Sequence, residues 1–155
     1  MFLISSGDTD ITRYITVQGH EGDRNHLDPW HDGNALVQAV AQTTSTIVVV
    51  HSVGPITLES ILAQPNVVAV VWAGLPGQES GHGLVDVLFG DFSPSGKLPY
   101  TIGKAEADYG TFWTTEPVDT FDEGLFIDYR HFDQNGIQPR YEFGFGLCKF
   151  PFIGS

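Results

Sequence analysis

Cysteine and basic residues are scarce in this chain of 155 residues. Its single cysteine, Cys148, leaves no partner for a disulfide within the chain. Seven Lys and Arg residues stand against 19 Asp and Glu, which gives a formal net charge of −12. A surface this acidic repels nucleic-acid phosphates and anionic lipid, so the composition argues against both as partners.

Long apolar runs are scarce as well. The longest are far too short to cross a bilayer, and residues 1–4 lead directly into a polar stretch without a basic segment before them. We therefore expect neither a membrane span nor a signal peptide in this chain. Hydrophobic residues still make up 41% of the sequence and charged residues 17%, which is typical of a globular domain and not of disorder.

The spacing of the apolar residues predicts alternating strands and helices. Strands are expected at 14–19, 46–51 and 67–72, and helices at 34–42, 56–62 and 83–89. The second and third strands are apolar on both faces, which is typical of buried parallel strands, and they are expected to lie side by side in the centre of the sheet. The core, residues 14–90, is thus predicted to be α/β, with a mainly parallel sheet flanked by helices.

Outside this core the pattern is irregular. A polar loop is expected at 20–33. Residues 91–147, which we call the apron, combine turn-forming residues with acidic and aromatic segments and are expected to be rich in loops. Within the apron, Asp128 and Arg130 are expected to form an ion pair at the end of a strand. The whole chain, 1–155, is expected to fold as one domain.

A glycine-rich loop at 74–83 separates an expected strand from an expected helix, and Glu79 is its only acid. In a parallel sheet such a loop lies beyond the carboxyl end of its strand, where ligands bind. Its glycines fail the G-x-G-x-x-G pattern of a dinucleotide site, and its serine is misplaced for a nucleophile elbow. His26 and His31 fit no standard zinc-binding spacing. We therefore expect neither a cofactor nor a metal.

Five segments carry a family resemblance: LDPWHDGNALVQAVA, IVVVHSVGPITLESIL, VVWAGLPGQESGHGLVDVLFGDFSPSGKLPYTIGKAEADYGT, EGLFIDYRHFD and PRYEFGFGL. They resemble the second domain of the fungal family 3 glycoside hydrolases, the β-glucosidases. The resemblance extends over 14–147 and implies an α/β sandwich stacked on a barrel-like first domain, with the active site between the two. It also implies secretion, and hydrolysis of terminal non-reducing β-D-glucosyl residues by a retaining mechanism in the breakdown of cellulose and cello-oligosaccharides.

The same resemblance implies that part of the enzyme is absent from this chain. In the family, the nucleophilic aspartate belongs to the first domain, and a fibronectin-like third domain follows the second. The chain is therefore expected to be a β-glucosidase fragment, inactive alone, whose substrate would be a β-glucoside or oligosaccharide. A barrel domain on another chain is the partner that this implies. The alternative is an inactive remnant that acts as a carbohydrate-binding or partner-docking module.

A retaining glycosidase needs two carboxylates about 5–5.5 Å apart, one as nucleophile and one as proton donor. The fungal donor is the glutamate of a Ser-Gly-Glu-Gly-Tyr loop, which the resemblance places within residues 5–14. Alignment from the start of this loop brings Asp8 onto the glutamate, and alignment from Tyr14 brings Thr12 there. Asp8 is thus the candidate donor, and a solvated loop acid is the alternative role for it.

Glu79 and Tyr14 complete the candidate site. In the plant-like branch of the family, the glutamate at the position of Glu79 is the proton donor. In fungal sequences it resembles a supporting residue, which is expected to lie close to backbone N–H groups of the following helix. Tyr14 matches the tyrosine that lines the leaving-group subsite; the alternative is an ordinary aromatic residue of a strand. Trp30 and Trp72 are expected to pack in the core rather than against a sugar.

Overall fold

The computed structural model describes residues 2–6, 14–17, 20–24, 26–111 and 118–146, with side chains from residue 26 onward. Its strands are β1 (Phe2–Ser6), β2 (Tyr14–Val17), β3 (His20–Arg24), β4 (Thr46–Ser52) and β5 (Val67–Trp72). Its helices are α1 (Gly33–Ala41), α2 (Glu59–Leu62), α3 (Ser80–Phe89) and α4 (Tyr129–Asn135), with the 3-10 helix η2 (Glu106–Tyr109). Among the described residues, no helix has the length and apolar character needed to span a membrane.

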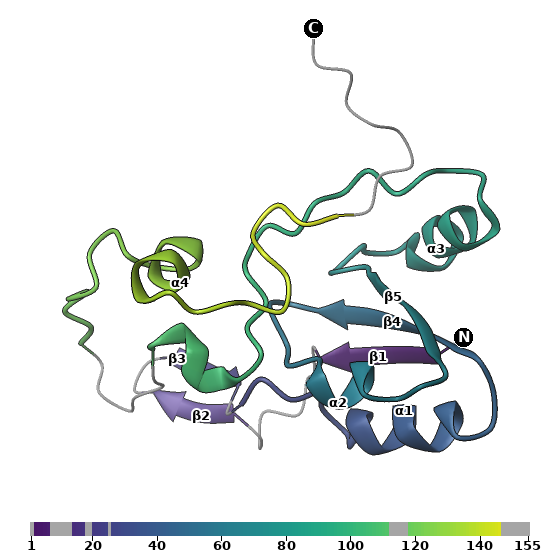
Figure 1. The fold of residues 1–155 in the computed structure, drawn as a ribbon, viewed down its shortest axis with the longest axis horizontal. Coiled ribbons are helices and arrows are strands. Elements are labelled where there is room, and N and C mark those ends of the chain that lie inside the picture. Colours follow the sequence, from purple (N-terminus) through teal and green to yellow (C-terminus); the bar gives the residue numbers. More distant parts are fainter. Residues whose placement is uncertain (1, 7–13, 18–19, 25, 112–117, 147–155) are drawn as a thin grey trace, which may run out of the picture.

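Three strands form a parallel sheet in the order β1-β4-β5 (Figure 1). Ser52 of β4 lies opposite Ser6 of β1, and Val50 of β4 lies opposite Trp72 of β5. The α/β class and the parallel pairing of β4 with β5 are therefore confirmed. The prediction that both strands are central was wrong for β5, which lies at the edge of the sheet in the described part of the chain. An edge strand and a central strand can carry the same apolar run, so the sequence pattern did not separate them.

Two segments near the N-terminus differ from the sequence prediction. Residues 14–17 pair antiparallel with 20–24 and form the hairpin β2–β3, in which Tyr14 lies opposite Arg24. The first segment is therefore not a strand of the parallel sheet, and the second is not a loop. The first parallel strand is instead β1, which has five residues, too few for a clear apolar period.

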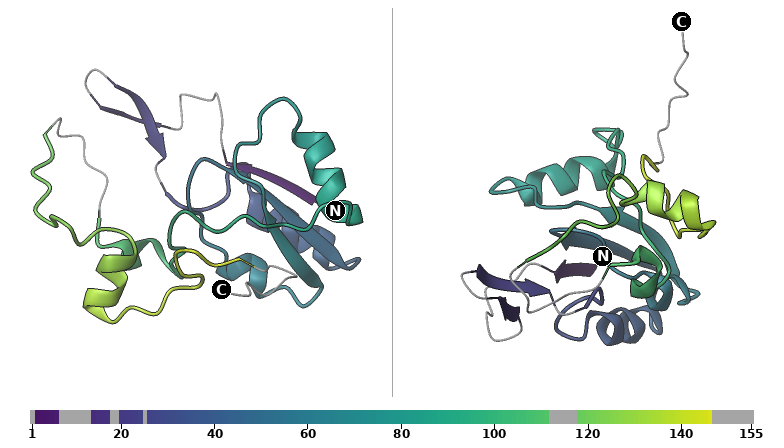
Figure 2. Two further views of the ribbon diagram at one scale, coloured as in Figure 1. Left: turned by 90° about the horizontal axis from the view of Figure 1, so that it is seen from above. Right: turned by 90° about the vertical axis from the view of Figure 1, so that its left-hand side faces the viewer.

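Helices α1 and α2 lie on one side of the sheet, and α3 lies beyond the other side (Figure 2). Val37 of α1 and Ile61 of α2 are fully buried in one core with Val50 of β4. Helix α2 is shorter than the predicted 56–62, because the residues before Glu59 enter the core in an irregular conformation. None of the ten residues of α3 is buried, so this helix contributes little to the core.

The two halves of the apron are joined by backbone hydrogen bonds. The N–H of Ile102 donates to the carbonyl of Tyr141 (2.8 Å), and the N–H of Leu98 donates to the carbonyl of Phe145 (2.8 Å). The carbonyl of Leu98 in turn accepts from the N–H of Gly144 (2.9 Å). Segments about 40 residues apart in the sequence thus run side by side, with Ile102 and Tyr141 forming an antiparallel bridge.

Asp128 and Arg130 do not form the predicted ion pair at a strand end. Asp128 immediately precedes α4, and its carboxylate accepts hydrogen bonds from the N–H (2.9 Å) and the hydroxyl (3.2 Å) of Thr101. The guanidinium of Arg130 lies 4.9 Å from the centre of the Tyr129 ring. Asp128 therefore joins the two halves of the apron, because the main chain of Thr101 offers its carboxylate a donor that the sequence could not reveal.

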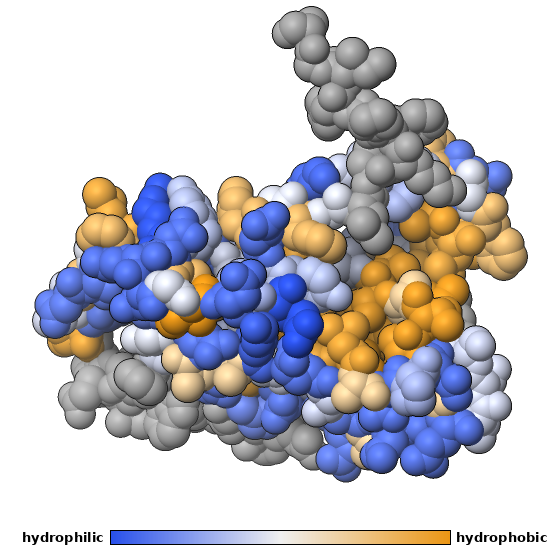
Figure 3. All heavy atoms as spheres, viewed as in Figure 1, coloured by the Kyte–Doolittle hydropathy of each residue, from blue (hydrophilic) through white to orange (hydrophobic). Residues whose placement is uncertain are grey.

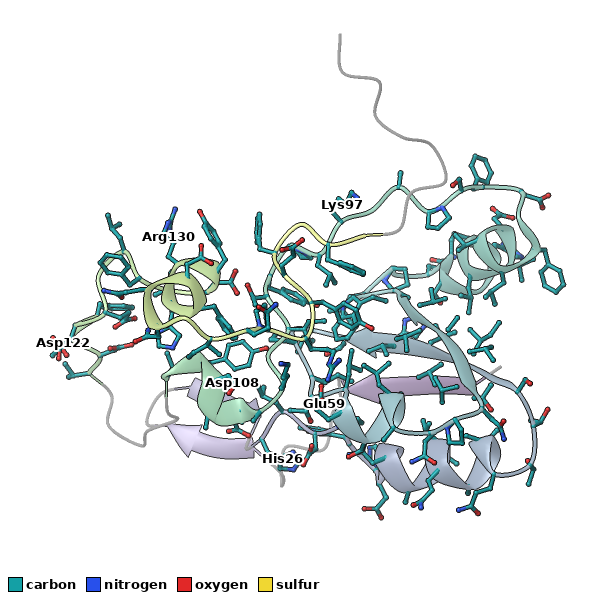
Figure 4. All side chains as sticks on the ribbon, viewed as in Figure 1. His26, Glu59, Lys97, Asp108, Asp122 and Arg130 are labelled. Atoms are coloured by element: carbon teal, nitrogen blue, oxygen red, sulfur yellow. The ribbon has the colours of Figure 1, made fainter. Side chains whose placement is uncertain are left out.

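A pair of oppositely charged side chains ties the apron to the core. Figure 4 shows Glu59 at the junction of α2 with the apron, where Arg140 donates two hydrogen bonds to its carboxylate, one of them Nε to Oε1 at 2.6 Å. The hydrogen bond from Arg140 holds the pKa of Glu59 below its usual value, and the same contact raises the pKa of Arg140. The bidentate geometry fixes the position of the apron relative to α2.

Replacement of Val50 tests the position of β4. Val50→Ala removes two fully buried methyl groups and is expected to lower the free energy of unfolding by about 2 kcal/mol. The matched variant Val68→Ala alters a residue of β5 that is 64% exposed. It is expected to change the free energy of unfolding by less than about 0.5 kcal/mol. Urea denaturation followed by circular dichroism measures both, and equal losses would contradict the central and edge positions of the two strands.

The Glu59–Arg140 pair predicts a pH dependence of stability. Glu59→Gln is expected to lower the free energy of unfolding at pH 7 by up to about 1 kcal/mol, since the pair is partly exposed. Folding lowers the pKa of Glu59, so its contribution is present above the unfolded value of about 4.3 and is lost as the pH falls through the folded value.

Denaturation of both proteins between pH 3 and pH 7 measures this difference, with Asp122→Asn at the outer end of the apron as the control (Figure 4). The gap between the native protein and Glu59→Gln should close at the acid end, because a protonated Glu59 resembles the glutamine. A gap that widens as the pH falls would show that Glu59 does not stabilise the fold as a carboxylate.

Candidate functional site

The carboxyl ends of the three parallel strands meet at one edge of the sheet. The last residue of β1, Ser6, lies opposite the last residue of β4, Ser52, and β5 ends two residues earlier in the register. Since β4 separates β1 from β5, the ends of these outer strands are about 10 Å apart. Asp8 follows β1 by two positions, and Glu79 follows β5 by seven. Both acids therefore follow, in the sequence, strands that end at the same edge of the sheet.

The side chains of two predicted site residues, Asp8 and Tyr14, lie outside the described part of the structure. Asp8 lies outside the described residues, so its role stays a prediction. Tyr14 begins β2, and its backbone pairs with that of Arg24, but its side chain lies outside the described part. Its place in a leaving-group subsite therefore also stays a prediction.

Two glycines shape the loop that carries Glu79. The loop leaves the sheet through a hydrogen bond from the N–H of Ala73 to the carbonyl of Val50 (2.9 Å). Gly74 and Gly77 then adopt left-handed backbone conformations, with φ of 61° and 76°. No atom lies within 4 Å of where their Cβ would be, so the glycines are needed for the direction of the chain and not for a close approach.

The Glu79 side chain lies in solvent with one partner. Its Oε2 is 2.8 Å from Nδ1 of His82, and the two side chains are 71% and 89% exposed. Glu79 stands at the N-cap of α3, and thus at the N-terminus of the helix, as expected, but no hydrogen bond joins its carboxylate to the helix N–H groups. Sequence analysis missed His82, although its position three residues after Glu79, at the start of a helix, favours such a contact.

The aromatic residues near this edge are held by the protein itself. Trp72, the last residue of β5, donates a hydrogen bond from Nε1 to the hydroxyl of Tyr100 (2.7 Å), and the two rings meet edge to face at 6.0 Å. Trp30 is buried, with 5% of its surface exposed. Both tryptophans thus pack as predicted, and the apron reaches the carboxyl edge of the sheet through Tyr100.

The described residues from 26 onward contain no group of three or more His, Cys, Asp or Glu side chains arranged to hold an ion. His26 and His31 line a hollow with Asp28 and Asp32, and Asp28 accepts a hydrogen bond from the hydroxyl of Thr57 (2.7 Å). This arrangement fixes the loop ahead of α1 and offers no set of metal ligands.

Comparison with known proteins gives one family. The profile of the family described as "Glycosyl hydrolase family 3 C-terminal domain" matches residues 3–147. "Probable beta-glucosidase L" of Emericella nidulans is 81% identical over 135 residues, which cover 86% of this chain and 18% of that protein. "Beta-glucosidase cel3A" of Pyricularia oryzae is 68% identical over 143 residues, which cover 92% of this chain and 20% of that protein.

A solved structure agrees with these sequence matches. The crystal structure of beta-D-glucoside glucohydrolase from Trichoderma reesei superposes with a TM-score of 0.84 at 64% identity, over 95% of this chain and 20% of that one. The chain therefore spans about a fifth of the length of the relatives it matches.

Proposed function

Because the chain belongs to the glycosyl hydrolase family 3 C-terminal domain family, we propose that it forms one wall of a β-glucosidase active site. The substrate is a β-glucoside or cello-oligosaccharide, from which a terminal non-reducing glucosyl residue is removed with retention of configuration. The sheet order supports the proposal, since β1, which precedes Asp8 in the sequence, and β5, which precedes Glu79, end at one edge of the sheet. Secretion, implied by the family resemblance, is part of the proposal.

The proposed division of labour follows from retaining chemistry. A nucleophilic carboxylate of another domain attacks the anomeric carbon, while a donor on this chain protonates the leaving oxygen and later takes a proton from water. We assign the donor to Asp8 and the leaving-group contact to Tyr14. The donor must come within hydrogen-bond reach of the glycosidic oxygen, and the side chain of Asp is shorter than that of Glu by one methylene. Glu79, exposed beside His82, is the alternative donor.

A second candidate function is a docking module without catalysis. Apolar surface gathers over β5 and α3 (Figure 3), where Phe89 is 81% exposed, Phe92 67% and Val68 64%. Exposed apolar patches beyond a few hundred Å² often mark a binding partner. In the enzyme this partner would be the barrel domain, and in a non-catalytic module it would be another protein.

A chimera tests the catalytic proposal. Residues 3–147 replace the corresponding segment of the Emericella nidulans relative, and hydrolysis of cellobiose and of 4-nitrophenyl β-glucoside is measured. The chimera is expected to hydrolyse both, whereas the isolated chain is expected to hydrolyse neither. Asp8→Asn is expected to lower kcat for cellobiose by about 10²–10⁴-fold, because its leaving alkoxide needs a proton. The loss should be smaller for the aryl glucoside, whose phenolate leaves without one.

Glu79→Gln and Asp122→Asn are the matched comparisons in the same chimera. Glu79→Gln is expected to affect the two substrates alike, and Asp122→Asn to change neither rate. A folded chimera without hydrolysis would contradict the proposal. Glu79→Gln could instead be the variant that lowers kcat for cellobiose more than for the aryl glucoside, with no such difference for Asp8→Asn. That result would assign the donor role to Glu79.

The exposed surface of α3 predicts self-association of the isolated chain. Light scattering at rising concentration is expected to show oligomers despite the net charge of −12, which opposes them. Phe89→Ser should reduce the association, and Phe121→Ser, at an exposed residue of the apron, should not. A stable monomer at high concentration would contradict both the apolar docking surface and its place in a larger enzyme.

A further inference from the structure

The apron contains a hollow that is lined by residues from both of its halves. It has a volume of about 300 Å³, at the small end of the range for ligand sites. Its lining comes from α4, from the turn after that helix, from 142–143 and from Thr101. Arg130, labelled in Figure 4, marks α4 at this end of the molecule. We propose that this hollow binds one sugar ring of a β-glucoside or cello-oligosaccharide.

The floor of the hollow is fixed by packing and by hydrogen bonds. Phe132 is buried, with its ring edge to face against Tyr109 at 5.4 Å. Thr101 is also buried, and its N–H and hydroxyl are both bonded to Asp128. After the left-handed turn at Gly136, the N–H of Ile137 donates to the carbonyl of Phe132 (2.9 Å). A floor held in this way needs little ordering when a ligand binds.

One wall of the hollow is aromatic. The rings of Tyr129 and Phe143 lie 5.1 Å apart with a tilt of 40°, and the two residues are 37% and 50% exposed. The Arg130 guanidinium at 4.9 Å helps to hold the Tyr129 ring. The two rings form a rigid, solvent-exposed aromatic surface, against which the C–H face of a pyranose ring can pack.

The rim of the hollow supplies hydrogen-bond acceptors. Asp133, Gln138 and Glu142 are exposed, and neither carboxylate has a hydrogen-bond partner within the described part of the chain. Sugar hydroxyls can donate to such carboxylates in charge-assisted hydrogen bonds. An aromatic wall with an acceptor rim matches the two kinds of surface that a sugar ring presents.

The charges around the hollow favour a neutral polyol over an ion. Two carboxylates on the rim repel an anion. A cation would be attracted by them, but Arg130 already lies over the Tyr129 ring, and its charge opposes a second cation at that wall. The choice of glucosides rests on the proposed function. The affinity is expected in the millimolar range, because the hollow is small and open to water.

Saturation-transfer difference NMR with cellobiose and cellotetraose tests this inference on the full 155-residue chain. The method observes the sugar, so it works even where the protein associates. Saturable transfer is expected for the native protein, with at least about tenfold weaker binding for Phe143→Ala and for Asp133→Asn. The matched controls Phe121→Ala and Asp122→Asn change an exposed aromatic and an exposed acid elsewhere in the apron, and should bind as the native protein does.

Three outcomes would overturn the inference. They are no saturable transfer, equal binding by the native protein and both hollow variants, or saturable transfer to spermidine with none to the sugars. Circular dichroism checks the fold of each variant, and Asp133→Asn, at an exposed residue, keeps the test open if Phe143→Ala unfolds. Sugar binding by the isolated chain does not require turnover by the chimera. Failure of this site and failure of the proposed catalytic role are therefore distinguishable.

Discussion

The central strand β4 must satisfy its backbone hydrogen bonds on both edges, because Val48, Val49 and Val50 are fully buried. It does so by pairing in parallel with β1 and with β5. Parallel pairing makes all three strands end at the same edge of the sheet. The common edge at which β1 and β5 end is thus a consequence of a burial requirement. The candidate site depends on β4 although β4 carries none of its acids.

The apron depends on apolar burial and on directional polar contacts together. Ile102 is buried in the same core as Val50, and the Glu59–Arg140 pair adds a polar contact with α2. The two halves of the apron are joined by hydrogen bonds of Ile102, Tyr141 and Asp128. These contacts are directional, so they set position more sharply than apolar burial would. Both the Tyr100 contact with Trp72 at the sheet edge and the hollow beside α4 follow from that placement. An acidic, loop-rich segment can therefore present a defined surface.

The sequence predicted the parts of the fold in which burial produces a visible pattern. Strands β4 and β5 and helix α1 were found at nearly the expected residues, because doubly apolar runs and helical spacing reflect direct contact with the core. The edge position of β5 was missed, since an edge strand can be as apolar as a central one. Strand β3 was missed because its sequence, HEGDR, has no apolar residue and therefore no apolar period.

The candidate site was less accessible to sequence analysis than the fold. The resemblance named Asp8, Glu79 and Tyr14, but the contact of Glu79 with His82 depends on side-chain conformation in solvent. The Thr101–Asp128 contact depends on a meeting of segments 27 residues apart. Side chains that bond to distant backbone groups have no local sequence pattern. Patterns of residue type therefore predicted which elements carry the acids, but not the neighbours of those acids.

The exposure of Glu79 links the two proposed roles of this domain. A carboxylate that is 71% exposed acts in bulk water, whereas proton transfer to a glycosidic oxygen gains from a site closed to water. Glu79 directly precedes α3, whose apolar residues include the exposed Phe89. Glu79 and Phe89 lie at the two ends of the same helix. A surface that covered α3 would therefore also approach the loop of Glu79. Burial of the exposed apolar patch and exclusion of water from the acid would then be a single docking event. For Glu79 as the alternative donor, the proposed role therefore requires a surface that covers α3.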